Sequence, residues 1–455
     1  MTQQIVENSN SLSLRDSLVK EFELTFSRNQ GNEPEALLQK REAALSAFQC
    51  AGIPTIKNEE WRFTNLVPFL KESYQLQPSG TPGRDVIEKA ILRATIQHLD
   101  AYRLVLVNGQ IDFSFSQLPV NQSDKQEGCM IRPISEVKAT EAFAKALNNT
   151  LPVEKYPFAA INTACFTDGF YMELARDFKL DKPLQIIHVY SDQENLFLQP
   201  RNIIQVNRGA SAEVLESSVL MSDKLLFVNG VTEIQVQENA HFKHAHFQVG
   251  EPQERWIMHT QVEQFRDSRY DNYTLTLPHA DLVRNNLNVI LDGSNTETHL
   301  YGLYMVDNNH LVDNHSLVDH RHPNCMSNQL YKGVILDGGR GVFNGKIYVH
   351  RPAQKTNAFQ QNNNLLFSPN ATINSKPQLE IFADDVKCSH GSTVGQFDDE
   401  ALFYLRSRGI GADTAHSLMV TAFAFDVTSK IENEALRNHI EQLIEKTIAQ
   451  AQAAL

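Results

Sequence analysis

The chain has 455 residues, of which 42% are hydrophobic and 21% are charged, and this composition excludes a long disordered protein. On the usual range of domain sizes, the length corresponds to roughly two to four structural units. The formal net charge of −13 argues against binding to nucleic acid or to an anionic membrane surface, because both require clustered Lys and Arg side chains.

The cysteines and the first residues of the chain indicate its compartment. The five cysteines are widely scattered and contain no CxxC pair, so neither a disulfide framework nor a structural zinc site is expected. The N-terminal stretch lacks the positive start and apolar core of a secretory signal. Even the most apolar runs, such as Ser417–Val427, are too short to cross a bilayer. We therefore expect a soluble, cytoplasmic protein.

Residues 1–150 are expected to form an N-terminal helical and mixed domain. A first helix is predicted from a run of apolar residues at every fourth position. These residues are Leu14, Leu18, Phe22 and Phe26. A second helix is predicted between Pro34 and Gly52, because proline favours the first turn of a helix and glycine its end.

Two further elements are expected in this domain. The segment Arg103–Phe115 contains an Asn-Gly pair between two β-rich runs, which is a strong signal for a β-hairpin. Thr140 precedes a short stretch of helical character that ends near Asn149, and a threonine at this position favours the start of a helix.

A β-rich core is expected over residues 151–395. From about Ala160, short runs of β-branched and aromatic residues follow one another without a long helical pattern between them. In Leu282–Leu291, apolar and polar residues alternate with Asn285 as the exception, which is typical of a strand with one buried face. Many short strands indicate a sandwich, a barrel or a β-solenoid. The large number of runs, with Asn and Gly repeated at the turns, favours the solenoid.

Helical patterns return in residues 396–455. Asp398–Gly409 has an acidic first turn, a basic last turn and a terminal glycine, which suit the two ends of a helix. Another helix is expected over Ala412–Val427. The last helix, Glu432–Gln450, carries an apolar stripe that requires a cover, either the chain's own core or a partner. The stripe consists of Leu436, Ile440, Leu443, Ile444 and Ile448.

Two patterns resemble ligand sites without meeting their requirements. Gly338–Ile347 is rich in glycine, but its spacing is one residue short of a phosphate loop and no hydroxyl residue follows Lys346, so the chain is not expected to bind a nucleotide. His244 and His246 share one strand face, with His241 nearby, and could share a metal ion. Without a carboxylate or thiol close in sequence, a polar strand face is the favoured interpretation.

The nucleophilic, acidic and metal-binding residues of the chain do not form a known catalytic pattern either. The sequence has no G-x-S-x-G motif, and the adjacent carboxylates of Asp384 and Asp385 point to opposite faces of an extended chain. A dense cluster of metal-binding residue types further upstream matches no standard metal loop, so a structural role is favoured. This cluster consists of Asp313, His315, Asp319, His320, His322 and Cys325.

The stretch Asp384–Gly395, "DDVKCSHGSTVG", places two carboxylates, a thiol and an imidazole within seven positions. Thiolates and imidazoles are good ligands for iron and zinc. On its own, the stretch is either a metal-handling corner or a polar turn between two elements.

The segment Phe343–Ile410 resembles the signature region of the SUF iron–sulfur cluster assembly scaffolds, the family of the paralogues SufB and SufD. Glu59–Leu66, "EEWRFTNL", resembles the N-terminal signature of this family, and Asp319–Ile347 resembles its central β region. The resemblance covers about residues 35–430.

Within this family the chain resembles the SufD branch. Asn362 stands where SufB carries a cysteine thought to be essential, and Ile381 stands where SufB carries a later cysteine. The "KCSHG" stretch instead resembles SufD, whose histidine in this motif is implicated in the nascent cluster site. The resemblance therefore implies that His390, with Cys388 as a weaker companion, handles a transient iron–sulfur cluster. Imidazole can replace a thiolate at iron, and a cysteine-bearing partner would complete the ligand set.

The resemblance further implies a right-handed parallel β-helix core, flanked by the two helical domains, and a heterodimer with a SufB-like paralogue through that core. The C-terminal helices are expected to dock a SufC-like ATPase, which would bind the ATP. A cysteine desulfurase system would act indirectly, and a flavin can belong to the assembled complex. The expected docking residues are Phe403, Tyr404, Leu405, Arg406, Arg408, Leu436, Ile440 and Leu443.

On this interpretation the chain is an assembly subunit and not an enzyme. Two alternatives stay open at this point. In the first, the chain is purely structural and all cluster chemistry belongs to SufB. In the second, it is a β-solenoid enzyme that acts on polysaccharide, although it lacks the spaced carboxylate pairs and the secretion signal that such an enzyme needs.

Overall fold

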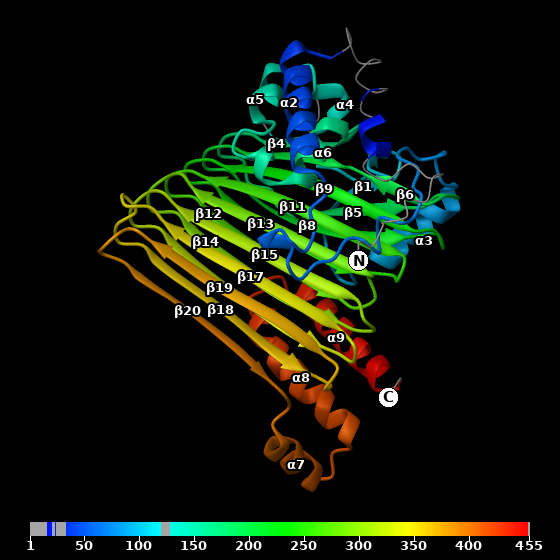
Figure 1. The fold of residues 1–455 in the computed structure, drawn as a ribbon, viewed down its shortest axis with the longest axis vertical. Coiled ribbons are helices and arrows are strands. Elements are labelled where there is room, and N and C mark those ends of the chain that lie inside the picture. Colours follow the sequence, from blue (N-terminus) through cyan, green and yellow to red (C-terminus); the bar gives the residue numbers. More distant parts are fainter. Residues whose placement is uncertain (1–15, 21–22, 24–32, 120–127, 454–455) are drawn as a thin grey trace, which may run out of the picture.

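A parallel β-solenoid forms the centre of the molecule (Figure 1). The structure is a computed structural model and describes residues 16–20, 23, 33–119 and 128–453. Two 10-stranded sheets, called A and B below, make up the solenoid, and helices lie at its N-terminal and C-terminal parts. The expected mainly-β fold, a parallel β-helix flanked by helices, is confirmed.

The chain alternates between the two sheets as it coils. Neighbouring strands are parallel except for β1–β2 and β3–β4, which are antiparallel. Sheet B has the order β2 (Gln110–Ile111), β1 (Tyr102–Val107), β5 (Leu184–Tyr190), β8 (Ser211–Leu220), β10 (His241–Val249), β12 (Arg269–Leu277), β14 (Glu297–Val306), β16 (Met326–Ile335), β18 (Asn357–Leu366), β20 (Lys387–Gly395). Sheet A has the order β19 (Thr372–Ile381), β17 (Arg340–Val349), β15 (Leu311–His320), β13 (Leu282–Leu291), β11 (Glu254–Gln264), β9 (Leu226–Val236), β7 (Arg201–Val206), β4 (Gly169–Leu174), β3 (Cys129–Pro133), with β6 (Leu196–Leu198) also on β9.

The alternation predicted for Leu282–Leu291 places one set of side chains in the solenoid interior. Val283 and Val289 of β13 lie in the main apolar core. Asn285 also faces inward, and its amide nitrogen donates to Asn314 over 3.1 Å, so a buried amide pair replaces an apolar contact. The opposite face of β13 is also covered, because Arg284 is only 2% exposed. The expectation of a single buried face is therefore wrong for this strand.

Helices of the N-terminal part cover the first strands of sheet A on their outer face (Figure 1). The helix expected between Pro34 and Gly52 is α2 (Glu35–Ala51), and Gly52 ends it with a φ of 67°. Helix α6 (Pro157–Cys165), which was not expected, packs on α2 and carries a proline in its first turn. The remaining helices are η1 (Glu59–Trp61), α3 (Arg84–Ala94), α4 (Ile134–Val137), α5 (Glu141–Ala146) and η2 (Val153–Lys155).

Two local predictions for this part are confirmed. Strands β1 and β2 form a hairpin in which Asn108 and Gly109 take φ angles of 48° and 86°, as the tight turn requires. The Thr140 side chain accepts a hydrogen bond from the backbone N–H of Phe143 and so caps α5. Of the residues predicted for the first helix, Leu18 is described and buried in a helical segment. Leu14, Phe22 and Phe26 lie outside the described residues.

Three helices follow the last strand, namely α7 (Asp399–Ser407), α8 (Ala412–Thr428) and α9 (Glu434–Ala453). The stripe on α9 packs against the outer face of sheet B, where Ile440 and Ile444 join Tyr273 and Leu303 in one apolar cluster. The chain's own core therefore covers the stripe. Helix α7, in contrast, projects away from the sheets and has no buried residue (Figure 1).

The domain limits at residues 150 and 395 remain predictions. The two sheets begin before residue 151, because β1 already pairs with β5 and β3 with β4.

None of the helices in the part of the chain that the structure describes combines the length and the hydrophobicity that a membrane span requires.

Candidate functional site

The stretch Asp384–Gly395 forms the last strand of sheet B and the turn before it. Strand β20 pairs with β18 on one side only, and in the described part of the chain no strand lies on its other edge. Strand β19 is the last strand of sheet A in the same way. We call this end of the solenoid, formed by β18, β19 and β20, the open end. The stretch is a sheet edge and not merely a polar turn.

The register places Cys388 and His390 on the inward side of β20. Cys388 pairs with Ala358 and His390 pairs with Gln360 on β18. Residues opposite one another on adjacent strands point to the same face of a sheet. Gln360 is buried and donates to the side chain of Gln329 over 2.7 Å, which fixes this face as the interior. The thiol and the imidazole thus lie side by side at the mouth of the solenoid.

The two side chains differ in exposure. His390 is exposed, whereas Cys388 is half-buried and packs against the apolar cluster of Ala358 and Ala383. Burial raises the pKa of the Cys388 thiol, so the thiolate that binds metal is disfavoured in the isolated chain. Among the described residues, no three side chains of His, Cys, Asp or Glu are grouped so that they could hold a metal ion.

Asn362 is buried next to this site, in a network of amides and hydroxyls. Its side-chain oxygen accepts hydrogen bonds from Asn364 and from Ser375, both over 2.7 Å. The Ser375 hydroxyl also lies 2.9 Å from that of Ser392 on β20. The position where the paralogue carries a cysteine is therefore a structural amide here, and it ties β18 and β19 to the edge strand.

The histidines of β10 are placed differently from the prediction. His244 faces the solenoid interior and not a polar surface, with its Nε2 atom 2.7 Å from Glu216. His188 contacts the other oxygen of Glu216 over 2.8 Å. Burial alone would raise the pKa of Glu216, but the two imidazoles outweigh it and hold that pKa well below its usual range. Burial lowers the pKa of His246 to about 4, so this imidazole is neutral at physiological pH.

The cluster between residues 313 and 325 does not converge on one point. Asp313 pairs with Arg284 and His315 on the outer face of sheet A, whereas His320 points inward and contacts the Ser327 hydroxyl over 2.9 Å. The structural role that the spacing favoured agrees with these separate pairings. The glycines of the segment 338–347 lie in the turn before β17 and within that strand, not before a helix as a phosphate loop requires.

Comparison with known proteins identifies the family. The family description "SUF system FeS cluster assembly, SufBD core domain" matches residues 188–423, and "SufBD protein N-terminal region" matches residues 15–186. The chain belongs to the SufBD family of iron–sulfur cluster assembly proteins. The resemblance found in the sequence is thus confirmed over nearly the whole chain.

Several curated relatives support the same conclusion. The chain is 30% identical to "Iron-sulfur cluster assembly protein SufD" of Escherichia coli strain K12 over 402 residues, which cover 86% of this chain and 88% of the relative. It is 30% identical to a SufBD family protein of Synechocystis over 91% of this chain and 92% of the relative. A SufBD family protein of Staphylococcus aureus is 23% identical over 92% and 90%. The chain is therefore SufD-like, as expected.

Sequence reasoning missed which way the site faces. The signal was present in the two-residue spacing of Cys388 and His390, which puts both on one face of a strand. Which side of the sheet that face takes was not readable from β18, because its buried inward residues Gln360, Asn362 and Asn364 are polar amides.

Proposed function

We propose that this chain is a scaffold subunit of the SUF system that pairs with a SufB-like paralogue through its open end and presents His390 to a nascent iron–sulfur cluster at that junction. The observation that carries the proposal is the placement of His390 and Cys388 at the mouth of the solenoid, on a strand that pairs with β18 on one edge and with no described strand on the other. In this role the chain assembles and positions the cluster, which is its cargo, and is not an enzyme in its own right.

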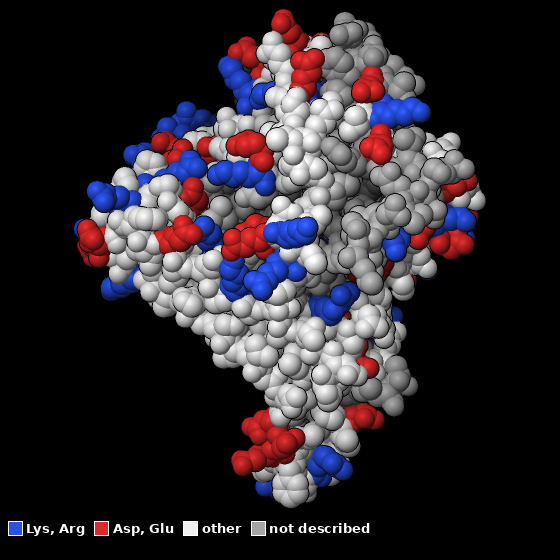
Figure 2. All heavy atoms as spheres, in the orientation of Figure 1, with Lys and Arg blue, Asp and Glu red and all other residues white. Residues whose placement is uncertain are grey.

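The open end has the features of a partner surface. β19 and β20 are long edge strands, and such edges invite pairing with another chain unless they are short, charged or covered. Large apolar side chains are exposed there, including Phe382 at 54% and Val394 at 52%. Figure 2 shows a broad area without acidic or basic side chains over the lower part of these strands. A second solenoid docked here would extend both sheets.

The chemistry of the two inward side chains fits a shared site. An exposed imidazole and a half-buried thiol supply at most two ligands, and iron–sulfur clusters are usually held by thiolates with occasional imidazoles. The pKa of the free Cys388 thiol is raised, but binding to iron would still remove its proton, because a thiol that coordinates a metal is deprotonated. A partner that brings cysteines to the mouth would complete the set.

Helix α7 is the proposed docking element for a SufC-like ATPase. Phe403 is 74% exposed and Tyr404 is 58% exposed, on a helix that buries no residue. Leu418 and Phe425 of α8 are also exposed, which extends the apolar surface. Leu436 and Ile440 are 1% and 2% exposed, because they lie between α9 and sheet B. The docking surface that we propose therefore does not include these two residues.

The remaining expectations come from the family resemblance and not from the geometry. ATP would bind the ATPase, the cysteine desulfurase system would act indirectly, and a flavin can belong to the assembled complex, which we place in the cytoplasm. The alternative of a polysaccharide-acting enzyme loses its basis, since the family descriptions together match residues 15–186 and 188–423.

The test is the content of iron and acid-labile sulfide in the complex after co-expression with SufB-like and SufC-like partners. We expect His390→Ala to lower the content strongly, and Ser389→Ala, which changes the outward neighbour on the same strand, to leave it unchanged. Both complexes must assemble to the same extent as the wild type. Unchanged content in His390→Ala would favour the purely structural subunit.

A further inference from the structure

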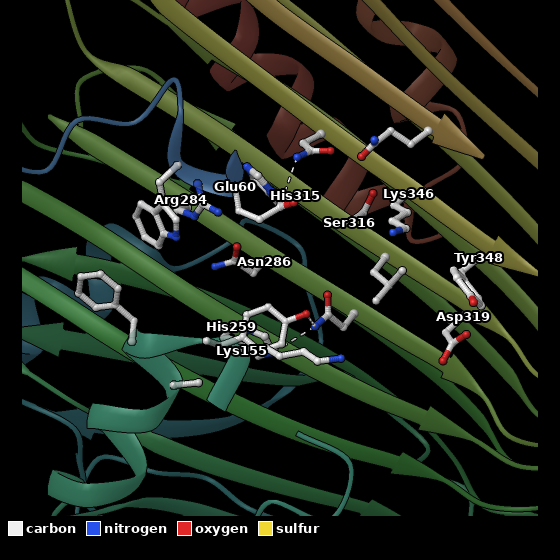
Figure 3. A pocket seen from close by; sticks show the side chains of 18 of the residues that line it. Glu60, Lys155, His259, Arg284, Asn286, His315, Ser316, Asp319, Lys346 and Tyr348 are labelled. Carbon is white, nitrogen blue, oxygen red and sulfur yellow. Dashed lines mark hydrogen bonds and ion pairs between the residues drawn. The ribbon is translucent and has the colours of Figure 1, made fainter. Parts of the chain in front are cut away.

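A large cavity lies on the outer face of sheet A, on the opposite side of the sheet from the solenoid interior. Its volume is about 690 Å³, which is within the range of small-molecule sites. Strands β11 to β19 form its floor, and the segments around Trp61 and Tyr156 form its walls (Figure 3). The cavity is therefore built from three parts of the chain that lie far apart in sequence.

The floor consists of polar side chains in register across the strands. His259, Asn286, His315 and Asn344 form one row across four parallel strands. Burial lowers the pKa of His259 to about 4, so this imidazole is neutral at physiological pH. The amide nitrogen of Asn286 donates a hydrogen bond to the Met258 carbonyl over 3.3 Å. Its oxygen has no hydrogen bond within the described chain and is free to accept one from a ligand.

One end of the cavity is aromatic. The rings of Trp61 and Phe158 lie 5.4 Å apart, and the Arg284 guanidinium sits 3.8 Å from the Trp61 ring centre. Tyr156 packs on His259 with a ring distance of 4.6 Å. Asp313 pairs with Arg284, so this buried charge is already neutralised. Glu60 also lines this end, and its carboxylate lies 3.2 Å from the His315 ring. The aromatic end therefore combines flat ring surface with charged groups that are paired with one another.

The other end of the cavity carries basic side chains. Figure 3 shows Lys155 extending across the cavity, with Lys346 and Tyr348 beyond it. Lys346 pairs with Glu380 over 2.6 Å, and Arg321 pairs with Asp319 over 2.9 Å. Lys155 has no ion pair with any described residue, and so its ammonium group is available to an anion.

We propose that this cavity binds a small molecule that joins a flat ring to a phosphate group. The ring would lie at the aromatic end between Trp61 and Tyr156, and the phosphate would lie near Lys155 and Lys346. Phosphate is the anion that fits here, because a lysine ammonium binds it as a point charge and needs no planar fork. The polar floor would form hydrogen bonds with the linker between ring and phosphate. No phosphate loop is involved.

This site is independent of cluster assembly. Its lining residues lie on the outer face of sheet A, whereas His390 lies on β20 and faces the solenoid interior. Lys155 and Trp61, which lie outside β18, β19 and β20, can therefore be substituted in the full-length chain without altering the open end. A failure of this inference leaves the proposed function intact, and the reverse also holds.

The test is isothermal titration calorimetry of the purified chain with naphthyl phosphate, naphthol and inorganic phosphate. We expect naphthyl phosphate to bind with one site per chain, and each half-probe to bind at least roughly tenfold more weakly, because only the whole probe uses both ends. No binding of naphthyl phosphate, or equal binding of inorganic phosphate, would overturn the proposal.

Two substitutions with the same change of charge locate the site. Lys155→Glu should weaken the binding of naphthyl phosphate by at least roughly tenfold, since a charge-assisted contact becomes a repulsion. Lys145→Glu, on the exposed side of α5, should change nothing. Equal effects of both substitutions would contradict the inference, because they would indicate a general electrostatic attraction. Circular dichroism and thermal melting verify that both variants fold.

Tryptophan fluorescence supplies a second readout. The chain has two tryptophans, of which Trp61 lines the cavity and Trp256 lies in the solenoid interior. We expect naphthyl phosphate to change the fluorescence of the wild type and to leave that of Trp61→Phe unchanged, while calorimetry still detects binding to the variant. A response that survives in Trp61→Phe would place the ligand elsewhere.

Discussion

The two ends of the solenoid finish their sheets in different ways. At the N-terminal end, β1 is covered by the two-residue strand β2 and by Gln117, which exchanges backbone hydrogen bonds with Arg103 over 2.8 and 2.7 Å. At the open end, β20 offers nine residues of edge to solvent. Short covered edges resist pairing and long free edges promote it. The contrast supports the proposal that the open end, and not the N-terminal end, is completed by another molecule.

The largest expected effect comes from placing charge at the open end. The double substitution Phe382→Lys and Val394→Lys should weaken pairing with the SufB-like partner by at least roughly tenfold, because docking would bury unpaired ammonium groups. Leu92→Lys with Phe113→Lys introduces the same charge near the N-terminal end and should leave pairing unchanged. Size-exclusion chromatography with light scattering measures the complex. Equal loss in both double variants would remove the distinction between the two ends.

A smaller effect is expected from adding one methyl group in the packed middle and at the open end. A Cβ atom at Gly302 would lie 2.2 Å from the Tyr331 ring, whereas one at Gly391 would meet nothing within 4 Å. Gly302→Ala should therefore lower the free energy of unfolding by about 1–3 kcal/mol through overpacking. Gly391→Ala should leave it nearly unchanged. Urea unfolding followed by circular dichroism compares the two, and a similar loss for both would mean that β20 is packed as tightly as β14.

The smallest effect concerns two helix caps in which a side-chain oxygen accepts hydrogen bonds from the first turn. Thr140 caps α5, which buries Phe143 and Ala146, and Asp398 caps α7, which buries no residue. Thr140→Ala should lower the free energy of unfolding by about 1 kcal/mol. Asp398→Ala should leave global unfolding unchanged and reduce only the hydrogen-exchange protection of α7, because local opening is independent of the core. A drop in the melting temperature of Asp398→Ala would show that α7 belongs to the cooperative unit.

Local signals in the sequence predicted the local elements well. The Asn108–Gly109 hairpin, the Thr140 cap and the Gly52 helix end each depend on a few neighbouring residues, so their patterns were sufficient. The repeated short β-rich runs were likewise enough to favour a solenoid. Helix α6 was missed because Pro157–Cys165 is short, mostly apolar and buried from Phe158 to Cys165, and periodicity does not distinguish such a run from a buried strand.

The arrangement of the sites depends on contacts that no local pattern contains. The inward direction of His390 follows from its register with Gln360, and that register is set by the coiling of the whole chain. The outer-face cavity joins Trp61, Lys155 and Lys346, which no motif connects. The burial of Leu436 follows from its packing in one cluster with Tyr273 of sheet B. Sequence reasoning found the residues at the open end through family resemblance, but not the geometry around them.

The junction between β20 and α7 has a mechanical consequence. Only Gln396, Phe397 and Asp398 separate the edge strand from the projecting helix, and the Phe397 ring is held by Phe367 and His416 at 5.0 and 4.9 Å. A pull on α7 along the strand axis would load all the hydrogen bonds between β20 and β18 together, in shear. The contacts of Phe397 brace the connection against sideways displacement. In the proposed complex, movement of an ATPase docked on α7 would therefore reach the open end through these three residues.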